Sequence, residues 1–295
     1  MLTRFQFEIM DCLYENKNIS TQADLKVAIH PDYADVAETM KQLENLDYIQ
    51  DFRITDKGFE ALEPFRVKRA VLLAAGFGSR LVPVTLNTPK PLVRVHGKRI
   101  IDGLIDAVLA AGIEEIYIVR GYLAEQFDQL LYKYPMIRFI ENPAYNETNN
   151  ISSALCARYL FSNAYLFESD LLLRKPELIK RYQYSSNFLA FHKDRSDDWC
   201  FTISDGYIAT HKIGGVDCYQ EYGVSYWDEK SGRKLASDIK EAYEMPGGKE
   251  LFWTQIPLSV FHDNYQVEVR ECREGDIVEI DTFRELKEID RSYDV

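Results

Sequence analysis

The sequence predicts an α/β protein with a mostly parallel sheet and helices on both faces, preceded by a small helical domain. From residue 69 onward, short apolar stretches alternate with stretches whose apolar residues recur at helical spacing, which is typical of βαβ units. Residues 1–68 hold helical stretches and one short alternating stretch instead. The 295 residues are enough for two domains, so we expect domains at 1–68 and 69–295.

Composition and charge describe an ordinary soluble protein with an acidic surface. Hydrophobic residues make up 46% of the chain, and the formal net charge of −12 disfavours non-specific binding to nucleic acid or anionic membranes. The five cysteines are scattered without a C-x-x-C pair, so neither a zinc site nor a disulfide framework is indicated. No apolar run approaches the roughly 18 residues of a membrane span, and the N-terminal stretch contains acids. We therefore expect a cytoplasmic protein with no membrane partner.

The first 68 residues predict a helical module with a short β-structure. Apolar residues recur at helical spacing in three stretches, and Thr21 is placed to cap the second of them. The expected elements are helices over 2–13, 22–29, 33–46 and 59–62, a strand at 48–55 and a turn at Asp56-Lys57-Gly58. Three helices followed by a small β-wing resemble a winged helix-turn-helix module.

The charge of this module disfavours DNA as its partner. A DNA-reading third helix should present Arg, Lys, Asn or Gln, whereas this one offers Asp35, Glu38 and Glu44 with a single lysine. The module as a whole has 8 lysines and arginines against 13 aspartates and glutamates. A packing, dimerising or regulatory role is therefore the preferred interpretation, while DNA binding and the formation of a homodimer both stay open.

The stretch RAVLLAAGFGSRLVPVTLNTPKPL has the pattern of a phosphate-binding site. Ala70–Ala74 predicts a short buried strand, and Gly76 and Gly78 lie in the turn that follows it. Arg80 comes just beyond the turn, and Lys90 lies between two prolines. Backbone N–H groups converge in such a turn, and cations neutralise phosphate charge. The pattern lacks the Gly-Lys-Ser/Thr of a P-loop and the third glycine of a dinucleotide-binding turn.

Beyond this loop, helices and strands alternate as in a parallel α/β sheet. We expect helices over 100–111, 123–132 and 153–160, strands over 115–119 and 137–140, and a further strand from Tyr165. Ligands of such sheets bind beyond the carboxyl ends of the strands. Gly121 and Tyr122 follow one of these ends directly. The polar loop NPAYNETNNISS holds asparagines that either cap the next helix or contact a ligand.

Two acids at predicted strand ends are candidate magnesium ligands. Asp170 ends the apolar strand that begins at Tyr165, and Asp281 follows a β-prone run near the C-terminus. Mg²⁺ prefers oxygen ligands and usually takes one or two protein carboxylates beside phosphate oxygens and water. The residues alone leave a second interpretation of Asp281, which is that it caps a helix expected at 283–289.

The region from about 185 to 275 is rich in aromatic residues. Most of them are expected in the core or in hairpins. Trp199 follows two aspartates, and Phe252 directly precedes Trp253. A quaternary ammonium group cannot donate a hydrogen bond, so ring faces and nearby carboxylates hold it. These positions therefore also suit an ammonium-binding pocket.

From Gly76 to Asp290, about three quarters of the chain, the sequence resembles the bacterial choline-phosphate cytidylyltransferases of the nucleotidyltransferase family. The resemblance rests on LAAGFGSRL, TPKPL, NETNNISSAL, the Trp199 region, GVSYWDEKSG, ELFWTQ and EIDTFRELKEID. It implies a Rossmann-like nucleotidyltransferase sheet and an enzyme that depends on Mg²⁺. The implied reaction is an in-line displacement in which choline phosphate attacks CTP, giving CDP-choline and pyrophosphate. The implied partners are therefore CTP and choline phosphate.

The resemblance also implies a role for each candidate residue. Arg80 and Lys90 would carry the charge of the reacting phosphates as catalytic residues, and Asp170 and Asp281 would hold Mg²⁺. Family members often have Asp-x-Asp where this chain has Glu168-Ser169-Asp170, which leaves a role for Glu168 open. The implied nucleotide-binding residues are Ala74, Ala75, Gly76, Gly78, Ser79, Gly121, Tyr122 and Asn150. The implied choline pocket comprises Trp199, Phe252 and Trp253.

Other functions stay open at this point. Aminoethylphosphonate or ethanolamine phosphate would be the acceptor instead of choline phosphate if carboxylates contribute more than aromatic rings to binding its ammonium group. A sugar 1-phosphate is a third, less favoured acceptor. In a different class, a winged-helix regulator would use a nucleotidyltransferase-like domain to sense its ligand. That hypothesis predicts a degraded active site, whereas both cations and both acids are present. The role of residues 1–68 does not follow from the resemblance.

Overall fold

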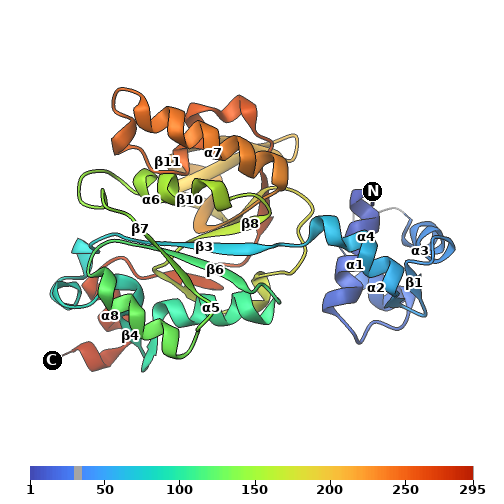
Figure 1. Cartoon of the computed structure of the whole chain (residues 1–295). Coiled ribbons are helices and arrows are strands. Elements are labelled where there is room, and N and C mark those ends of the chain that lie inside the picture. The colour runs from blue at the N-terminus through green and yellow to red at the C-terminus, as the bar shows by residue number, and fades with distance from the viewer. Residues whose placement is uncertain (30–34, 295) are drawn as a thin grey trace. The chain divides into compact units, whose positions relative to one another are not determined.

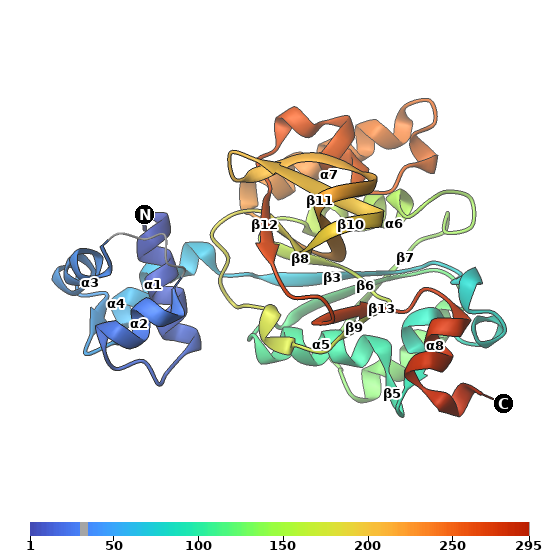
Figure 2. The same ribbon diagram turned by 180° about the vertical axis from the view of Figure 1, so that it is seen from behind.

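The computed structural model describes residues 1–29 and 35–294, which form two compact units. Unit 1 comprises Met1–Arg66 together with Tyr182–Tyr184, and unit 2 comprises Val67–Arg181 and Ser185–Val295. Each unit has its own buried core, so each is described by itself (Figures 1 and 2). None of the helices in the described ranges is long and apolar enough to cross a membrane.

Unit 1 is a helical unit with one small antiparallel sheet. Its elements are α1 (Arg4–Glu15), α2 (Gln22–Ala28), α3 (Val36–Asn45), β1 (Ile49–Gln50), β2 (Arg53–Ile54) and α4 (Asp56–Leu62). The predicted start of the third helix, at residue 33, lies outside the described residues. The other helices and the small sheet lie near their predicted positions. The winged helix-turn-helix interpretation of this unit stays a prediction.

The core of unit 1 includes aromatic residues from a distant part of the sequence. The rings of Phe65 and Tyr184 stack with their centroids 5.3 Å apart. Phe7 packs against both of them, at 5.0 and 5.4 Å, and Tyr182 is buried in the same core. Large rings contribute much of the buried area in a core of this size. No local pattern in the sequence indicates that these two tyrosines belong to unit 1.

The prediction of a turn at Asp56-Lys57-Gly58 is wrong, because these residues form the first turn of α4. Thr55 caps the helix, and its Oγ1 accepts a hydrogen bond from the N–H of Gly58 at 3.0 Å. A Cβ at Gly58 would lie 2.0 Å from the carbonyl oxygen of Tyr48. Glycine is therefore needed here for close packing against another backbone segment rather than for a turn.

Unit 2 is built on a seven-stranded sheet with the order β12-β10-β11-β8-β3-β6-β7. The strands are β3 (Arg69–Ala74), β6 (Glu115–Arg120), β7 (Arg138–Glu141), β8 (Ala164–Glu168), β10 (Asn187–Ser204), β11 (Tyr207–Trp227) and β12 (Glu268–Glu271). β3 pairs in parallel with β6 and β8, β6 with β7, and β10 with β12. β11 runs antiparallel to both of its neighbours. The predicted mostly parallel sheet is confirmed.

Helices cover both faces of this sheet, as the sequence predicts (Figures 1 and 2). The covering helices are α5 (Ile100–Ala110) on one face and α6 (Ile151–Ala157) and α7 (Glu229–Glu244) on the other. Leu72 of β3 joins a core with Leu104 of α5, while Val71 joins a second core with Leu235 of α7. Successive side chains of a strand point to opposite faces, so β3 is buried on both sides.

Smaller elements complete unit 2. They are β4 (Arg94–Val95), β5 (Lys98–Arg99), β9 (Leu171–Leu173), β13 (Ile277–Glu279) and α8 (Phe283–Ile289). The helix predicted at 123–132 is a 3₁₀ helix, Ala124–Tyr132, because apolar spacing of three to four residues fits either helix type. The long β10–β11 pair has no counterpart among the predicted elements, since several register shifts interrupt its alternation.

We expect Gly58→Ala to destabilise unit 1 by about 1–3 kcal/mol, because the new methyl group would collide with the Tyr48 carbonyl. Gly103→Ala is the matched control. It lies on α5, where an added Cβ meets no atom within 4 Å, and we expect it to be neutral or stabilising by up to about 1 kcal/mol. Calorimetric melting of the full chain measures both changes. A wild-type melting profile for Gly58→Ala would contradict the close contact.

Candidate active site

The loop after β3 turns back over Lys90. Gly78 has a left-handed backbone conformation with φ of +66°, and a Cβ there would lie 3.0 Å from the Cβ of Lys90. The Thr85 hydroxyl donates a hydrogen bond to the Gly78 carbonyl at 2.9 Å, which fixes the turn. Both the conformation and the close approach therefore require glycine at this position.

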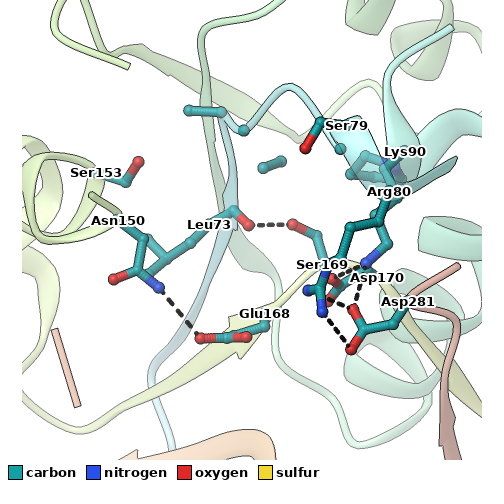
Figure 3. A pocket seen from close by; sticks show the side chains of 15 residues that line it. Leu73, Ser79, Arg80, Lys90, Asn150, Ser153, Glu168, Ser169, Asp170 and Asp281 are labelled. Carbon is teal, nitrogen blue, oxygen red and sulfur yellow. Dashed lines mark hydrogen bonds and ion pairs between the residues drawn. The ribbon is translucent and has the colours of Figure 1, made fainter. Parts of the chain in front are cut away.

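A pocket of about 270 Å³ opens at the carboxyl ends of β3 and β8 (Figure 3). Its lining residues are Leu73, Ala74, Ala75, Gly76, Gly78, Ser79, Arg80, Lys90, Pro91, Asn150, Ser153, Glu168, Ser169, Asp170 and Asp281. This edge of a parallel sheet is where a ligand is expected. The structure thus brings together the glycine-rich loop, both predicted cations, both predicted acids and the predicted asparagine.

Lys90 is the central charge of the pocket. Its side chain is only 9% exposed, and its Nζ lies 2.5 Å from Asp170 Oδ2 and 3.1 Å from Asp281 Oδ1. Burial lowers the pKa of Lys90, but the charge and hydrogen bond of Asp170 and the charges of Asp281 and Glu279 outweigh it and hold that pKa above its ordinary value. A cation that is itself shielded from water attracts phosphate more strongly than one at the surface.

Arg80 reaches the same pocket and pairs with Asp281. Its Nη2 lies 2.7 Å from Asp281 Oδ1, and its Nη1 donates a hydrogen bond to Oδ2 at 3.0 Å. A two-pronged contact of this kind is the preferred geometry of guanidinium with carboxylate or phosphate. The Arg80 side chain is 65% exposed, so water screens the ion pair and the guanidinium can exchange Asp281 for a ligand phosphate.

The pairing of β9 with β13 brings the two predicted acids together. In this antiparallel pair, the N–H of Ile280 donates to the carbonyl of Asp170 at 3.4 Å, so that Asp170 and Asp281 lie at the same end. The Ser169 hydroxyl donates a hydrogen bond to the Leu73 carbonyl, which joins the turn that carries the first acid to β3 (Figure 3). Residues that are distant in sequence therefore meet over one loop.

The alternative role of Asp281 as a helix cap is not what the structure shows. Thr282 caps α8, and its Oγ1 accepts a hydrogen bond from the N–H of Glu285 at 3.2 Å. Glu285 in turn accepts hydrogen bonds from the N–H groups of Asp281 and Thr282, each at 2.8 Å. This capping box leaves the Asp281 carboxylate for the two cations of the pocket.

Two further carboxylates lie close to Asp170. Glu168, Asp170 and Glu279 each have an oxygen within 4.8 Å of the others. Burial, followed by the charge of Asp170, raises the pKa of Glu168 to about 8. Burial, followed by the charges of Asp170 and Asp281, raises the pKa of Glu279 to about 10. Carboxylates crowded in this way are unfavourable unless a cation joins them.

This acidic cluster fits a divalent cation. Oxygen ligands suit a hard cation such as Mg²⁺, and Asp170 Oδ1 is buried without a hydrogen-bond donor from the described residues. A bound cation would also relieve the repulsion that raises the two pKa values. Glu168, left open by the sequence, belongs to the cluster by position. The sequence prediction missed Glu279, although it stands only two residues before Asp281.

Gly121 and Tyr122 support the glycine-rich loop, and the pocket lining does not include them. The N–H of Tyr122 donates to the Ala75 carbonyl at 3.0 Å, and its hydroxyl donates to the Thr85 carbonyl at 2.9 Å. The ring of Tyr145 covers Gly121 so closely that a Cβ there would lie 2.7 Å from it. The predicted contact of these two residues with a nucleotide stays a prediction.

Asn150 connects two segments of the site. It precedes α6, but its side chain makes no capping hydrogen bond. Instead its Nδ2 donates to Glu168 Oε1 at 3.3 Å (Figure 3). Its Oδ1 accepts a hydrogen bond from the N–H of Trp253 at 2.9 Å. Asn149 Nδ2 donates to the Glu250 carbonyl at 3.1 Å. The polar loop is thus bonded both to the acidic cluster and to the segment that carries the later aromatic residues.

The three aromatic residues predicted for a pocket fall into two groups. The rings of Trp199 and Phe252 lie 5.9 Å apart, and Phe252 is 39% exposed. Trp253 is 1% exposed, and its ring stacks on Phe188 in the core. Trp253 therefore contacts the site only through its backbone N–H, which binds Asn150. Its ring belongs to the core.

Comparison with known proteins agrees with this arrangement. The family of nucleotidyl transferases matches residues 69–241, which is more than half of the chain. The chain belongs to the nucleotidyl transferase family. It is therefore an enzyme, with the Rossmann-like nucleotidyltransferase fold that the resemblance implied.

Two relatives match this nucleotidyl transferase over almost their whole length. It is 34% identical over 228 residues to the 2-aminoethylphosphonate cytidylyltransferase of Lancefieldella rimae, covering 76% of this chain and 92% of the relative. It is 34% identical over 229 residues to the choline-phosphate cytidylyltransferase of Streptococcus pneumoniae, covering 75% of this chain and 97% of the relative. The solved structure of the CTP:phosphocholine cytidylyltransferase from Streptococcus pneumoniae matches with a TM-score of 0.70 at 31% identity, over 77% of this chain and 99% of that one.

Gly223 of β11 makes room for Glu168 in this nucleotidyl transferase. A Cβ at Gly223 would lie 2.6 Å from Cγ of Glu168. Glu221 stands two residues earlier, on the same face of the strand, and its charge adds to the raised pKa of Glu168. This contact depends on the pairing of β11 with β8, which no local feature of the sequence indicates.

We expect Gly223→Ala to lower the rate of nucleotidyl transfer by about 100-fold, because a shift of Glu168 by about 1 Å disturbs the acidic cluster and Asn150. The rate of pyrophosphate release at saturating substrates measures this, and a melting curve shows whether the variant is folded. Gly103→Ala, whose added Cβ meets open space, should keep the wild-type rate. A fully active Gly223→Ala variant would mean that the position of Glu168 does not matter for turnover.

Proposed function

We propose that this enzyme transfers a cytidylyl group from CTP to choline phosphate and releases pyrophosphate. The observation that carries the proposal is the pocket in which Lys90, Arg80 and the glycine-rich loop face a cluster of acids. The cations and loop N–H groups suit a triphosphate, and the acids suit the divalent cation that accompanies it. The names of both relatives support the cytidylyl group.

The reaction needs position and charge more than a catalytic base. The attacking oxygen belongs to the phosphate of the acceptor, which is already an anion. Its bond to the α-phosphorus of CTP forms while the bond from that phosphorus to pyrophosphate breaks. Lys90 would stabilise charge on the transferred group, and Arg80 would stabilise charge on the leaving pyrophosphate. Both cations would exchange carboxylate partners for phosphate oxygens when the nucleotide binds.

Asp170 and Asp281 would hold Mg²⁺, and Glu168 and Glu279 are close enough to Asp170 to take part. A bound Mg²⁺ supplies positive charge to the reacting phosphates. The protein fixes the backbone of Asp281 itself, since Glu285 accepts a hydrogen bond from the N–H of Asp281 at 2.8 Å. Ligands that are held in place before the substrate arrives lose little free energy to reorganisation.

The Trp199–Phe252 pair supports an acceptor that ends in an ammonium group. Ring faces attract a cation, most strongly where water is excluded. Glu221 of β11 adds a carboxylate beside His211, which stacks on Trp199. A neutral sugar gains nothing from this charge, so a sugar 1-phosphate is the least favoured of the acceptors considered.

Aminoethylphosphonate or ethanolamine phosphate is the second candidate acceptor. A primary ammonium donates three hydrogen bonds and therefore needs carboxylates, and Glu221 would provide one. The relative from Lancefieldella rimae carries the name of the aminoethylphosphonate activity at the same identity as the choline-phosphate relative. The balance between ring faces and carboxylates decides between the two acceptors.

Pyrophosphate release in the presence of Mg²⁺ tests the proposal directly. We would cross CTP, UTP and dTTP with choline phosphate, ethanolamine phosphate, aminoethylphosphonate and glucose 1-phosphate. The expected result is release with CTP and choline phosphate and little with the other pairs. Preference for a primary-amine acceptor would support the second candidate. If no pair released pyrophosphate, the proposal of cytidylyl transfer would be refuted.

Asp170→Asn and Asp281→Asn are each expected to raise the barrier by on the order of 3 kcal/mol, which is at least about a 100-fold loss in kcat. Each variant removes a negative charge that the cations and Mg²⁺ require, while the size of the side chain stays the same. Asp263→Asn is the matched control, because that carboxylate is fully exposed and pairs with His262. Wild-type kcat in a folded Asp170→Asn or Asp281→Asn variant would remove that residue from the catalytic site.

A further inference from the structure

A buried pair of a histidine and a glutamate lies behind Trp199. His211 of β11 stacks on Trp199 with ring centroids 4.5 Å apart and an interplanar angle of 27°. The His211 side chain is 0% exposed, and its Nε2 lies 2.9 Å from Oε2 of Glu221, whose side chain is 14% exposed. The two atoms are close, but their geometry does not make a hydrogen bond. Within the described residues, neither nitrogen of His211 nor Oε2 of Glu221 has a hydrogen-bond partner.

Such a pair is unfavourable for the fold alone. Burial removes both side chains from water and costs their hydration free energy. A contact without good hydrogen-bond geometry offsets little of that cost. Apolar side chains of similar size would pack in the same place without this penalty. The same ribbon of β10 and β11 carries a comparable pair at the surface, where His192 and Asp217 lie 2.8 Å apart and stay hydrated. The buried pair therefore calls for a reason other than stability.

The buried pair is adjacent to the active-site pocket. Glu221 and Gly223 share one face of β11, and Glu168, which lines the pocket, lies directly over Gly223. On the other side, His211 contacts Trp199, and Trp199 contacts Phe252. Glu221, His211, Trp199 and Phe252 are thus a series of neighbours beside Glu168, which lines the pocket.

We propose that Glu221 is the counter-charge for the ammonium end of the acceptor, and that His211 positions both Glu221 and the indole of Trp199. The inference rests on the proposed function, because it concerns the acceptor of that reaction. His211 lies against Oε2 of Glu221 without a hydrogen bond, while the Glu221 side chain as a whole stays 14% exposed. An ammonium group on the exposed side of the Glu221 carboxylate would offset the desolvation of this buried pair, and Trp199 would present a ring face to the same cation.

The pair would select acceptors by charge. An acceptor without a cationic end leaves the Glu221 carboxylate buried and uncompensated, which weakens its binding. An acceptor with an ammonium end, whether quaternary or primary, supplies the missing charge. The substrate class is therefore a small zwitterionic phosphate or phosphonate. His211 acts in this scheme as a positioning residue, because it reaches the substrate only through Glu221 and Trp199.

The test uses the full-length enzyme and three variants: Glu221→Gln, the double variant His211→Phe/Glu221→Leu, and the surface control His192→Gln/Asp217→Asn. We expect the first two to raise KM for choline phosphate by about tenfold or more, with KM for CTP and kcat changed by less than about threefold. KM for glucose 1-phosphate, where it is measurable, should not rise. The double variant should melt at or above the wild-type temperature, because apolar side chains replace a poorly aligned buried pair. The surface control should leave every parameter at its wild-type value.

Each result separates the inference from the reaction on which it rests. A wild-type KM for choline phosphate in either folded variant would overturn the role of the pair while the proposed reaction stands. Equal increases in KM for both substrates would also overturn it, since they indicate a structural role only. If wild-type enzyme used no ammonium-bearing acceptor at all, the proposed function and this inference would fall together. Glu221→Gln changes charge but not shape, so it decides the question if the double variant does not fold.

Discussion

The candidate active site depends on the balance of charge around Lys90. Four carboxylates enter one small region, and like charges at such distances oppose one another strongly when water is scarce. One buried ammonium group in contact with Asp170 and Asp281 offsets part of this repulsion. The left-handed turn at Gly78, which leaves room for Lys90, and the pairing of β9 with β13 bring this cation and these acids together. The remaining features of the site are arranged around that contact.

Much of this arrangement could be predicted from the sequence, because its signals are local. The strand, the two loop glycines, Arg80 and Lys90 lie within one short stretch, and Asp170 and Asp281 each end an apolar run. The parts that the sequence did not indicate depend on contacts between distant segments. The crowding of Glu279 against Asp170 follows from the register of β13 on β9, which neither segment specifies by its own pattern.

The aromatic residues also show that sequence alone does not predict contacts between distant segments. Phe252 and Trp253 are neighbours with similar chemistry, yet one ring meets Trp199 and the other is enclosed in the core. The direction of a side chain depends on the backbone of the turn in which it lies, and composition carries no information about that. The role proposed for His211 could not be predicted from the sequence for a related reason. It depends on the contacts of His211 with Trp199 of β10 and Glu221 of β11. The packing of Tyr182 and Tyr184 in unit 1 is a further contact of this kind.

The pairing of β9 with β13 has a consequence for the order in which the enzyme becomes competent during synthesis. β13 follows every strand of the seven-stranded sheet along the chain, and Asp281 comes after it. Domains can begin to fold while the ribosome is still adding residues. A nascent chain can therefore assemble the whole sheet, and the loop over Lys90, before the last acid of the pocket exists. The candidate site is then completed only once residues up to Asp281 have been added, after the scaffold can form.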